Sequence, residues 1–328
     1  MRKLAFLVVC LALSVVRAPL AHALDLEKFH QLVVFGDSLS DNGNLFAITE
    51  AEGIKPPQPP FPPYGETFDG TGPFPGRFTD GQNWVDYFPQ VANSFGVYVP
   101  PVNAFFKDHM GTNFAIGGST SEVLASQIST YLNSPIGQNP ANDLCVIWIG
   151  ANDFFNPTPI SPKVTAENIR NGIAQLSRAG ARTFIVINAP DISLTPRVMA
   201  TPTIIQAAKQ FVFAVNALLE VEILPFAWLN RITVEIVDIN AIFIPLVLNP
   251  SKFGFTNSTG AAIDPTTYAL LVTDPNDYVF WDGFHPTTGA HLIAAEFIYR
   301  SIAFRRHFPE TPRVPIVRLD LSEILTPR

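Results

Sequence analysis

Short apolar runs that end in small polar residues limit the possible folds of this chain more than any other feature. The run 32–35 precedes Gly36-Asp37-Ser38, and the run 144–149 precedes Gly150-Ala151-Asn152-Asp153. Runs of β-branched and aromatic residues bounded by glycine predict buried strands. In open α/β sheets, ligands bind at the carboxyl ends of such strands. We therefore expect Ser38 and Asn152 to lie at one edge of a sheet, although the residues around Ser38 also fit a capped turn into a helix.

Segments with the spacing of amphipathic helices separate the apolar runs. A helix that begins near Thr165 and ends at Gly180 precedes a predicted strand at Thr183–Ile187. A second helix over Ile204–Leu218 precedes another predicted strand at Ile232–Val237. Strands that alternate with helices of this length predict a parallel sheet with helices on both faces.

Two more elements are predicted in the first half of the chain. A strand over Thr112–Ile116 ends at Gly117-Gly118, where adjacent glycines allow close approach of the backbone. Apolar residues at helical spacing from Trp84 to Val91 predict a helix capped by Thr79 or Asp80. We interpret Gly76-Arg77-Phe78 as a turn before that helix.

The C-terminal part is predicted to be a loop followed by a helix. Residues 253–277 are polar and rich in glycine and proline, which indicates a loop. Pro286 suits the first turn of the last helix, so His285 would stand at the junction of loop and helix. The alternating apolar residues of 308–328 predict a short added strand.

Length and charge narrow the class of protein. The chain has 328 residues, 47% of them hydrophobic, which is enough for one large domain or two small ones, and no linker or internal repeat divides it. The net charge is −7, and no basic cluster is interleaved with aromatic residues, so a nucleic-acid partner is not expected. After residue 23 we identify no apolar stretch of the ~20 residues that cross a bilayer, since 241–248 is short and contains Pro245.

The first 23 residues have the features of a secretory signal peptide. Met1-Arg2-Lys3 is basic, Leu4–Val16 is apolar, and Ala21-His22-Ala23 fits a cleavage site. We therefore expect a secreted protein, extracellular or periplasmic, whose mature part 24–328 is a single domain. Cys145 would be the only cysteine left, so no internal disulfide can form, and its apolar surroundings indicate a buried side chain.

Three residues could together activate a hydroxyl for attack on an ester. Ser38 supplies the hydroxyl, His285 the base, and Asp282 a carboxylate that orients the imidazole. The developing oxyanion needs donors, and the backbone amides of Ser38 and Gly118 with the side-chain amide of Asn152 are the candidates.

The other histidines are less suited to act as the base. His30, His109, His291 and His307 lie before the first strand, in a loop, inside the last helix and at its end, where structural or solvated histidines are common. No two histidines have metal-ligand spacing beside a glutamate, so we expect neither a metal site nor a cofactor.

Four ordered blocks resemble the GDSL, or SGNH, hydrolases. They are Gly36-Asp37-Ser38-Leu39, Asn113 to Gly118, Gly150-Ala151-Asn152-Asp153, and Asp282-Gly283-Phe284-His285. Asp37 to Asn44 and Gly76-Arg77-Phe78 are similar to the branch that contains plant GDSL lipases and bacterial phospholipase-like esterases.

The resemblance implies a flavodoxin-like three-layer α/β/α fold with a parallel central sheet. It also implies Ser38 as nucleophile, Gly118 and Asn152 as oxyanion donors, His285 as base and Asp282 as its partner. The α/β-hydrolase fold is rejected, because its nucleophile lies in Gly-x-Ser-x-Gly and its acid and histidine are not neighbours. Asp37, Asp41, Asn42 and Asn44 are expected to frame the serine turn without a role in the chemistry.

We therefore expect a serine carboxylic-ester hydrolase that forms an acyl-serine intermediate, with a lipid or other apolar ester as substrate. The alternatives are acyl transfer by the same serine, acetyl-ester hydrolysis on a polysaccharide, and a binding module without activity. Substrate choice depends on aromatic residues that either form an apolar mouth or only pin the proline-rich loop 55–76 and its neighbours to the body: Phe61, Tyr64, Phe68, Phe74, Phe154 and Phe155.

Overall fold

The computed structural model describes residues 24–67, 72–93 and 111–303. The predicted signal peptide, the predicted strand within 308–328, and the side chains of Phe68, His109 and His307 lie outside the described residues.

Four parallel strands form the central sheet, in the order β1-β2-β3-β4. They coincide with four of the predicted strands, and their bounds are Gln31–Gly36 (β1), Asp143–Trp148 (β2), Thr183–Ile187 (β3) and Thr233–Val237 (β4). Every residue of β2 is buried, as expected for a strand covered on both faces.

The segment 112–116 lies along the outer edge of β1 but is not a regular strand. The Val34 amide donates to the Thr112 carbonyl at 2.9 Å, and the Phe114 amide donates to the Val34 carbonyl at 2.7 Å. Only one bridge, between Val34 and Asn113, is regular. The side chain of Asn113 accepts from the Ala115 amide at 3.0 Å, which binds the backbone locally in place of a longer ladder.

This edge segment makes the connectivity flavodoxin-like. Taken in chain order with it, the sheet runs 2-1-3-4-5, and the strand order reverses between β1 and β2. Ser38 follows β1 and Asn152 follows β2, so both lie at the reversal point where such folds bind ligands.

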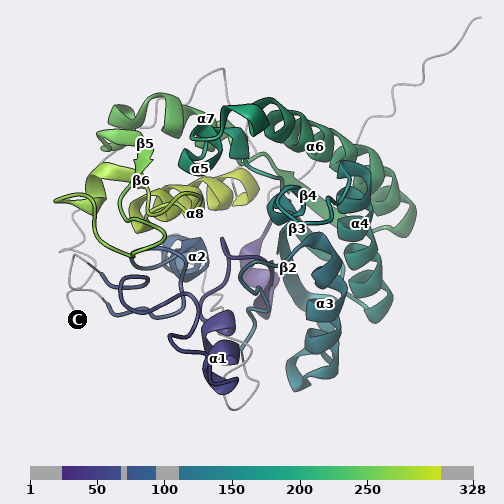
Figure 1. Ribbon diagram of the computed structural model, residues 1–328. Helices are drawn as coiled ribbons and strands as arrows, with labels where there is room; N and C mark the ends of the chain where they lie inside the picture. Colours follow the sequence, from purple (N-terminus) through teal and green to yellow (C-terminus); the bar gives the residue numbers. More distant parts are fainter. Residues whose placement is uncertain (1–23, 68–71, 94–110, 304–328) are drawn as a thin grey trace, which may run out of the picture.

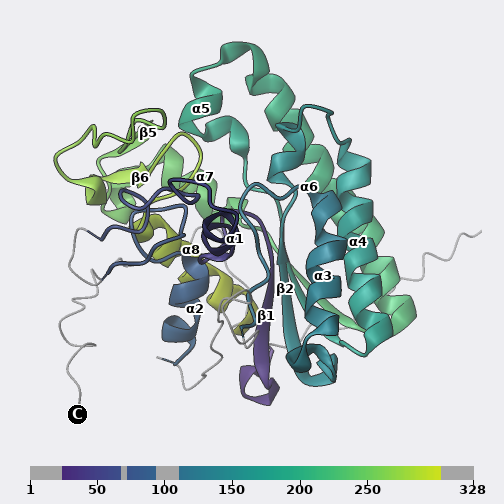
Figure 2. The ribbon, with the colours of Figure 1, turned by 60° about the horizontal axis from the view of Figure 1, so that its bottom comes forward.

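Helices cover both faces of the sheet and complete three layers. Figure 2 shows α2 and α8 on one side of β1 and β2, with α3, α4 and α6 on the other. Figure 1 shows α5, α7 and the β5–β6 pair grouped beside α8. The helix bounds are Asn44–Ala51 (α1), Trp84–Asn93 (α2), Leu124–Asn133 (α3), Pro162–Ala179 (α4), Pro196–Met199 (α5), Pro202–Asn230 (α6), Asn240–Leu248 (α7) and Thr288–Ala303 (α8).

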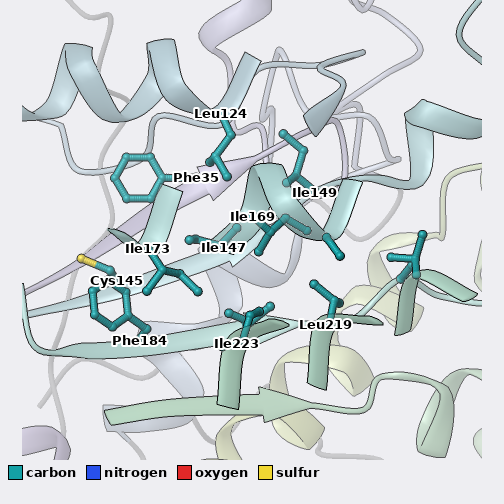
Figure 3. Close-up of a cluster of buried hydrophobic side chains, with 14 of the residues drawn as sticks. Phe35, Leu124, Cys145, Ile147, Ile149, Ile169, Ile173, Phe184, Leu219 and Ile223 are labelled. Carbon is teal, nitrogen blue, oxygen red and sulfur yellow. The ribbon is translucent and has the colours of Figure 1, made fainter. Parts of the chain in front are cut away.

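Alternate residues of each strand feed two separate apolar cores. Cys145 and Ile147 of β2 point toward α3, α4 and α6, where they pack with Phe35, Ile169 and other side chains drawn in Figure 3. Leu144, Val146 and Trp148 point the opposite way, toward α2 and α8. Cys145 is fully buried, as its apolar surroundings predicted, and burial raises the pKa of its thiol.

Two local expectations about helix starts differ from the structure. Asn83, not Thr79 or Asp80, caps α2, because its Oδ1 accepts from the amides of Val85 and Asp86. Asp80 instead accepts from the Thr288 amide at 2.7 Å, at the start of α8. That helix begins at Thr288, so Pro286 precedes it and forms a bridge with Phe280.

The predicted polar loop 253–277 also contains a strand. Residues Asn257–Ala261 (β5) pair in parallel with Tyr278–Phe280 (β6) in a separate two-stranded sheet. The sequence Asn-Ser-Thr-Gly-Ala of β5 has no apolar alternation, so periodicity did not indicate it.

By length and composition alone, α6 would be able to cross a membrane. The expectation of no such stretch overlooked this helix, because Lys209, Glu220 and Glu222 interrupt its apolar residues. One side of α6 packs into the core with Val215 and Leu219. The opposite side exposes a group of large apolar residues: Phe213, Val221, Leu224, Trp228 and Leu229.

Candidate active site

The turn after β1 is held by a dense set of hydrogen bonds around Asp41. Its carboxylate accepts from the amides of Gly43 at 2.8 Å, Asn44 at 2.6 Å and Gly117 at 2.7 Å. The last bond joins the serine turn to the Gly117-Gly118 segment. Burial raises the pKa of Asp41 to about 6, against the opposing effect of these backbone donors.

Asparagine side chains extend this frame. Asn113 donates to the Ser40 carbonyl at 2.7 Å and to Asn42 Oδ1 at 2.8 Å. Asn44 donates to the carbonyls of Asn113 and Ala115. The contacts of Asp41, Asn42 and Asn44 are those of a structural frame around Ser38, as the sequence predicted.

Ser38, His285 and Asp282 form one hydrogen-bonded chain. The Nε2 atom of His285 lies 2.8 Å from Ser38 Oγ, and its Nδ1 atom lies 2.7 Å from Asp282 Oδ2. The other carboxylate oxygen of Asp282 accepts from the amides of Phe284 at 2.8 Å and His285 at 2.7 Å. These two bonds fix the carboxylate in the turn that carries the histidine. The structure thus brings Ser38 into contact with His285, 247 positions later in the sequence, and with the neighbouring Asp282 completes the chain.

Asp282 and His285 each stabilise the charged form of the other. Burial acts to lower the pKa of His285, but the charge and hydrogen bond of Asp282 outweigh it, so the pKa lies above its ordinary value. Burial acts to raise the pKa of Asp282, and the charge of His285 with the three hydrogen bonds from residues 284 and 285 holds it below its ordinary value. The ionised Asp282 accepts a hydrogen bond from Nδ1–H of the neutral ring, and this tautomer leaves Nε2 free to accept a hydrogen bond from Ser38 Oγ.

The oxyanion candidates lie at the ends of the neighbouring segments. Gly118 has φ of +74°, which favours glycine, and a Cβ atom placed there would meet nothing within 4 Å. The backbone at Gly118 therefore faces open space. Asn152 Nδ2 donates one hydrogen to the Ser119 carbonyl at 3.0 Å, which orients the amide beside Gly118. Among the described residues, no partner accepts from its second N–H.

Asp37, directly before Ser38, is buried and titrates near neutrality. Only 2% of its surface is exposed, and the Leu39 amide donates to its carboxylate at 3.1 Å. Burial raises the pKa of Asp37 to about 7, because the backbone amides of Leu39 and Asp37 and the charge of His285 only partly offset desolvation.

Tyr64 is a site residue that motif reasoning missed. Its hydroxyl donates to Asp282 Oδ2 at 2.7 Å, the same oxygen that faces His285. The ring is 6% exposed and packs edge-on against Trp281 and Phe78. The sequence placed Tyr64 only among the aromatic residues of a proline-rich loop, and no spacing linked it to Asp282.

The Gly76-Arg77-Phe78 turn contributes directly to the site. The Phe78 ring lies against the His285 ring with centroids 5.1 Å apart. Arg77 holds the turn in place through two hydrogen bonds to Asp86, at 2.9 and 3.0 Å. A Cβ on Gly117 would lie 2.3 Å from Phe78, so glycine is required where these two segments meet.

The remaining aromatic residues divide between the two predicted roles. Phe155 and Phe284 are each more than a third exposed and meet with centroids 5.0 Å apart beside the histidine turn. Phe154 instead packs on Phe211 of α6. Phe74 lies under the Arg77 guanidinium, where it pins the loop.

The other described histidines do not take part in the hydrogen-bonded chain of Ser38, His285 and Asp282. His30 is exposed before β1. His291 is buried in α8, and burial lowers its pKa to about 3. Within the described residues, no group of three or more histidine, cysteine or acidic side chains is arranged to hold a metal ion.

Comparison with known proteins places these features in a family. The family model described as GDSL-like Lipase/Acylhydrolase matches residues 32–298. A GDSL esterase/lipase of Arabidopsis thaliana is 26% identical over 91% of this chain and 98% of its own length. The thermolabile hemolysin of Vibrio parahaemolyticus is 26% identical over 85% of this chain, and the match covers 65% of that protein.

A solved structure also resembles the fold. The acetylxylan esterase Axe2 of Geobacillus stearothermophilus is 17% identical, with a TM-score of 0.47 over 85% of this chain and 97% of that one. The match of the family model over most of the chain shows that the protein belongs to the GDSL-like lipase/acylhydrolase family and is a hydrolase of ester bonds.

Proposed function

We propose that the protein hydrolyses carboxylic esters through an acyl-serine intermediate on Ser38. The observation that carries this proposal is the continuous hydrogen-bonded chain from Ser38 Oγ through the His285 ring to Asp282. Such a chain supplies a nucleophile, a base and a group that orients the base.

In the first step, Ser38 Oγ attacks the ester carbonyl carbon and its proton passes to His285 Nε2. The imidazolium that forms is stabilised by Asp282, whose Oδ2 lies 2.7 Å from Nδ1. Collapse of the tetrahedral intermediate breaks the bond to the alcohol, and His285 returns the proton to the leaving oxygen. Water then attacks the acyl-serine and gives a proton to His285; the bond to Ser38 Oγ breaks, His285 returns the proton to that oxygen, and the carboxylic acid leaves.

The amides of Ser38 and Gly118 and the side chain of Asn152 would bind the oxygen that becomes negative in both steps. The open space at Gly118 and the anchoring of Asn152 by the Ser119 carbonyl support these roles. Donors of this kind are already oriented before the reaction, so they stabilise the transition state without reorganisation.

We further propose that the enzyme is secreted and that residues 24–328 form one domain. The basic, apolar and cleavage-site segments of the first 23 residues support secretion. Both cores share one sheet, which supports a single domain.

An apolar ester is the proposed substrate class. The exposed faces of Phe155 and Phe284 beside His285 favour an acyl chain or aryl group over a sugar. Acyl transfer to an alcohol would use the same serine, and adding an alcohol to the assay and identifying the products separates transfer from hydrolysis.

The test measures turnover of aryl esters of graded chain length by residues 24–328, Ser38→Ala and His285→Ala. We expect Ser38-dependent release of the alcohol and a large loss of kcat in both variants. A folded wild-type protein without turnover, or Ser38→Ala with wild-type activity, would contradict the proposal.

A further inference from the structure

An apolar cavity lies between α7 and α8, and residues adjacent in sequence to the proposed nucleophile and base help to line it. Three of its lining residues are sequence neighbours of the reacting residues: Leu39 follows Ser38, and Phe284 and Pro286 flank His285. Its buried walls come from the ends of β2 and β4 and from the two helices: Trp148, Ile239, Ile242, Leu246, Ala290 and His291. Helix α7 packs against α8 (Figure 1).

The chemistry of the walls selects the kind of group that fits. Almost all lining atoms belong to aliphatic or aromatic side chains. Two buried nitrogen atoms, Trp148 Nε1 and His291 Nδ1, have no hydrogen-bond partner within the described residues. Two polar atoms are too few to solvate a sugar or a charged group, each of which needs several partners when buried. The cavity therefore suits a hydrocarbon chain.

The position of the cavity distinguishes the two halves of an ester. The leaving alcohol must depart and be replaced by water that His285 activates, so its side of the site has to open to solvent. The acyl group becomes attached to Ser38 in the first step and stays until the second, and burial of its hydrocarbon against apolar side chains lowers the free energy of the complex. A cavity with buried apolar lining residues such as Leu246 fits the group that stays.

We propose that this cavity binds the acyl chain of the ester substrate and that its depth sets the preferred chain length. The proposal rests on the proposed ester hydrolysis through Ser38. It assigns the specificity of the enzyme to α7 and α8, two helices that none of the four sequence blocks includes.

Two opposite substitutions test the assignment. Ala294→Leu fills the cavity from α8, and Leu246→Ala deepens it from α7, since both residues line it. The matched control is Leu248→Ala on α7, whose side chain is 63% exposed. The kcat/KM of each variant is measured for aryl esters from acetate to decanoate, with the alcohol kept constant.

The expected result is a change in chain-length profile with little change for acetate. Ala294→Leu should lower kcat/KM for the longest esters that the wild type accepts by about tenfold or more, the usual effect of one methylene in an apolar pocket. Leu246→Ala should move the optimum to longer chains, and Leu248→Ala should keep the wild-type profile. Alkylphosphonate inhibitors of graded length provide a second readout, because their labelling of Ser38 should follow the same order.

Other results would overturn the assignment in distinguishable ways. If Ser38-dependent hydrolysis is present but both variants keep the wild-type acyl profile, the cavity does not bind the acyl chain. If the variants change the preference among alcohols at a constant acyl group, the cavity binds the alcohol instead. If no ester is hydrolysed by the folded wild type, the proposed function itself fails and the acyl assignment fails with it.

Discussion

The hydroxyl of Tyr64 and the imidazole of His285 both reach Oδ2 of Asp282, each at 2.7 Å. The two donors therefore share one carboxylate oxygen, and a residue of the proline-rich loop acts on the proposed base through its partner. Burial and the charge of Asp282 raise the pKa of Tyr64, so its hydroxyl remains a donor. We interpret Tyr64 as a positioning residue.

Tyr64→Phe should raise the pKa of His285 further. The hydroxyl draws negative charge of Asp282 Oδ2 toward itself, and its removal leaves that charge to stabilise the imidazolium. A hydrogen bond to a charged group is worth about 1.5–3 kcal/mol, so we expect the acid limb of kcat/KM to move up by about 1–2 pH units. Tyr268→Phe, on a ring 6.2 Å from that of Tyr64, is the control. An unchanged acid limb in Tyr64→Phe would refute a positioning role.

Asn152→Ala should lower kcat far more than it changes KM. The amide would bind an oxygen whose charge develops in the transition state, and losing one such donor typically costs about 10²–10³ in kcat. Asn168→Ala is a suitable control, because Asn168 also donates from its side chain, to Ser121 Oγ at 2.9 Å, without a proposed role in the reaction. Equal activity of the two variants would remove Asn152 from the mechanism.

Asp37→Asn should stabilise the protein at neutral and alkaline pH more than at acid pH. The pKa of Asp37 is raised to about 7 in the folded state, so the folded state binds the proton more tightly than the unfolded state does. Wild-type stability therefore falls as pH rises from about 4 to about 7, by up to ~1.4 kcal/mol per pH unit. Urea unfolding at pH 5 and pH 8 measures the difference. A variant less stable than wild type by the same amount at both values would show that Asp37 stays ionised.

Asp80→Ala should destabilise the start of α8 and displace the histidine turn. Asp80 Oδ1 accepts from the Thr288 amide at 2.7 Å. Thr79 Oγ1 lies 3.0 Å from Asp80 Oδ1 and 2.9 Å from the Pro286 carbonyl, and these two acceptors share its one hydrogen. Loss of a helix cap costs about 1 kcal/mol. We expect a lower midpoint of thermal unfolding together with reduced kcat. In the control Asp274→Ala, loss of an exposed cap on the Asn276 amide should leave kcat unchanged. Full activity of Asp80→Ala would separate α8 capping from catalysis.

The sheet and the hydrogen-bonded chain were predictable because their signals are local. The β-branched runs of β1 to β4 are bounded by glycine or polar residues, and Ser38 and His285 lie in short blocks with little freedom of position. The edge segment 112–116 was predicted as a strand, but its asparagine binds the backbone locally and limits the ladder to one bridge.

The parts that escaped prediction depend on contacts between distant segments. Tyr64 reaches Asp282 across 218 positions, and nothing in a proline-rich loop indicates which aromatic residue turns inward. Asp80 was expected to cap the helix next to it, but it caps one that begins 208 positions later. The sequence of β5 has no apolar alternation that would indicate a strand. Its extended conformation depends on pairing with β6.

Covalent labelling of Ser38 tests the central claim most directly. The protein is treated with an alkyl p-nitrophenyl phosphonate, activity is followed over time, and the labelled peptide is identified by mass spectrometry. We predict one phosphonyl group per chain, located on Ser38, with activity lost in proportion to labelling. The His285→Ala variant should be labelled more slowly than the wild type. Full ester hydrolysis by protein whose Ser38 is completely labelled would contradict the account.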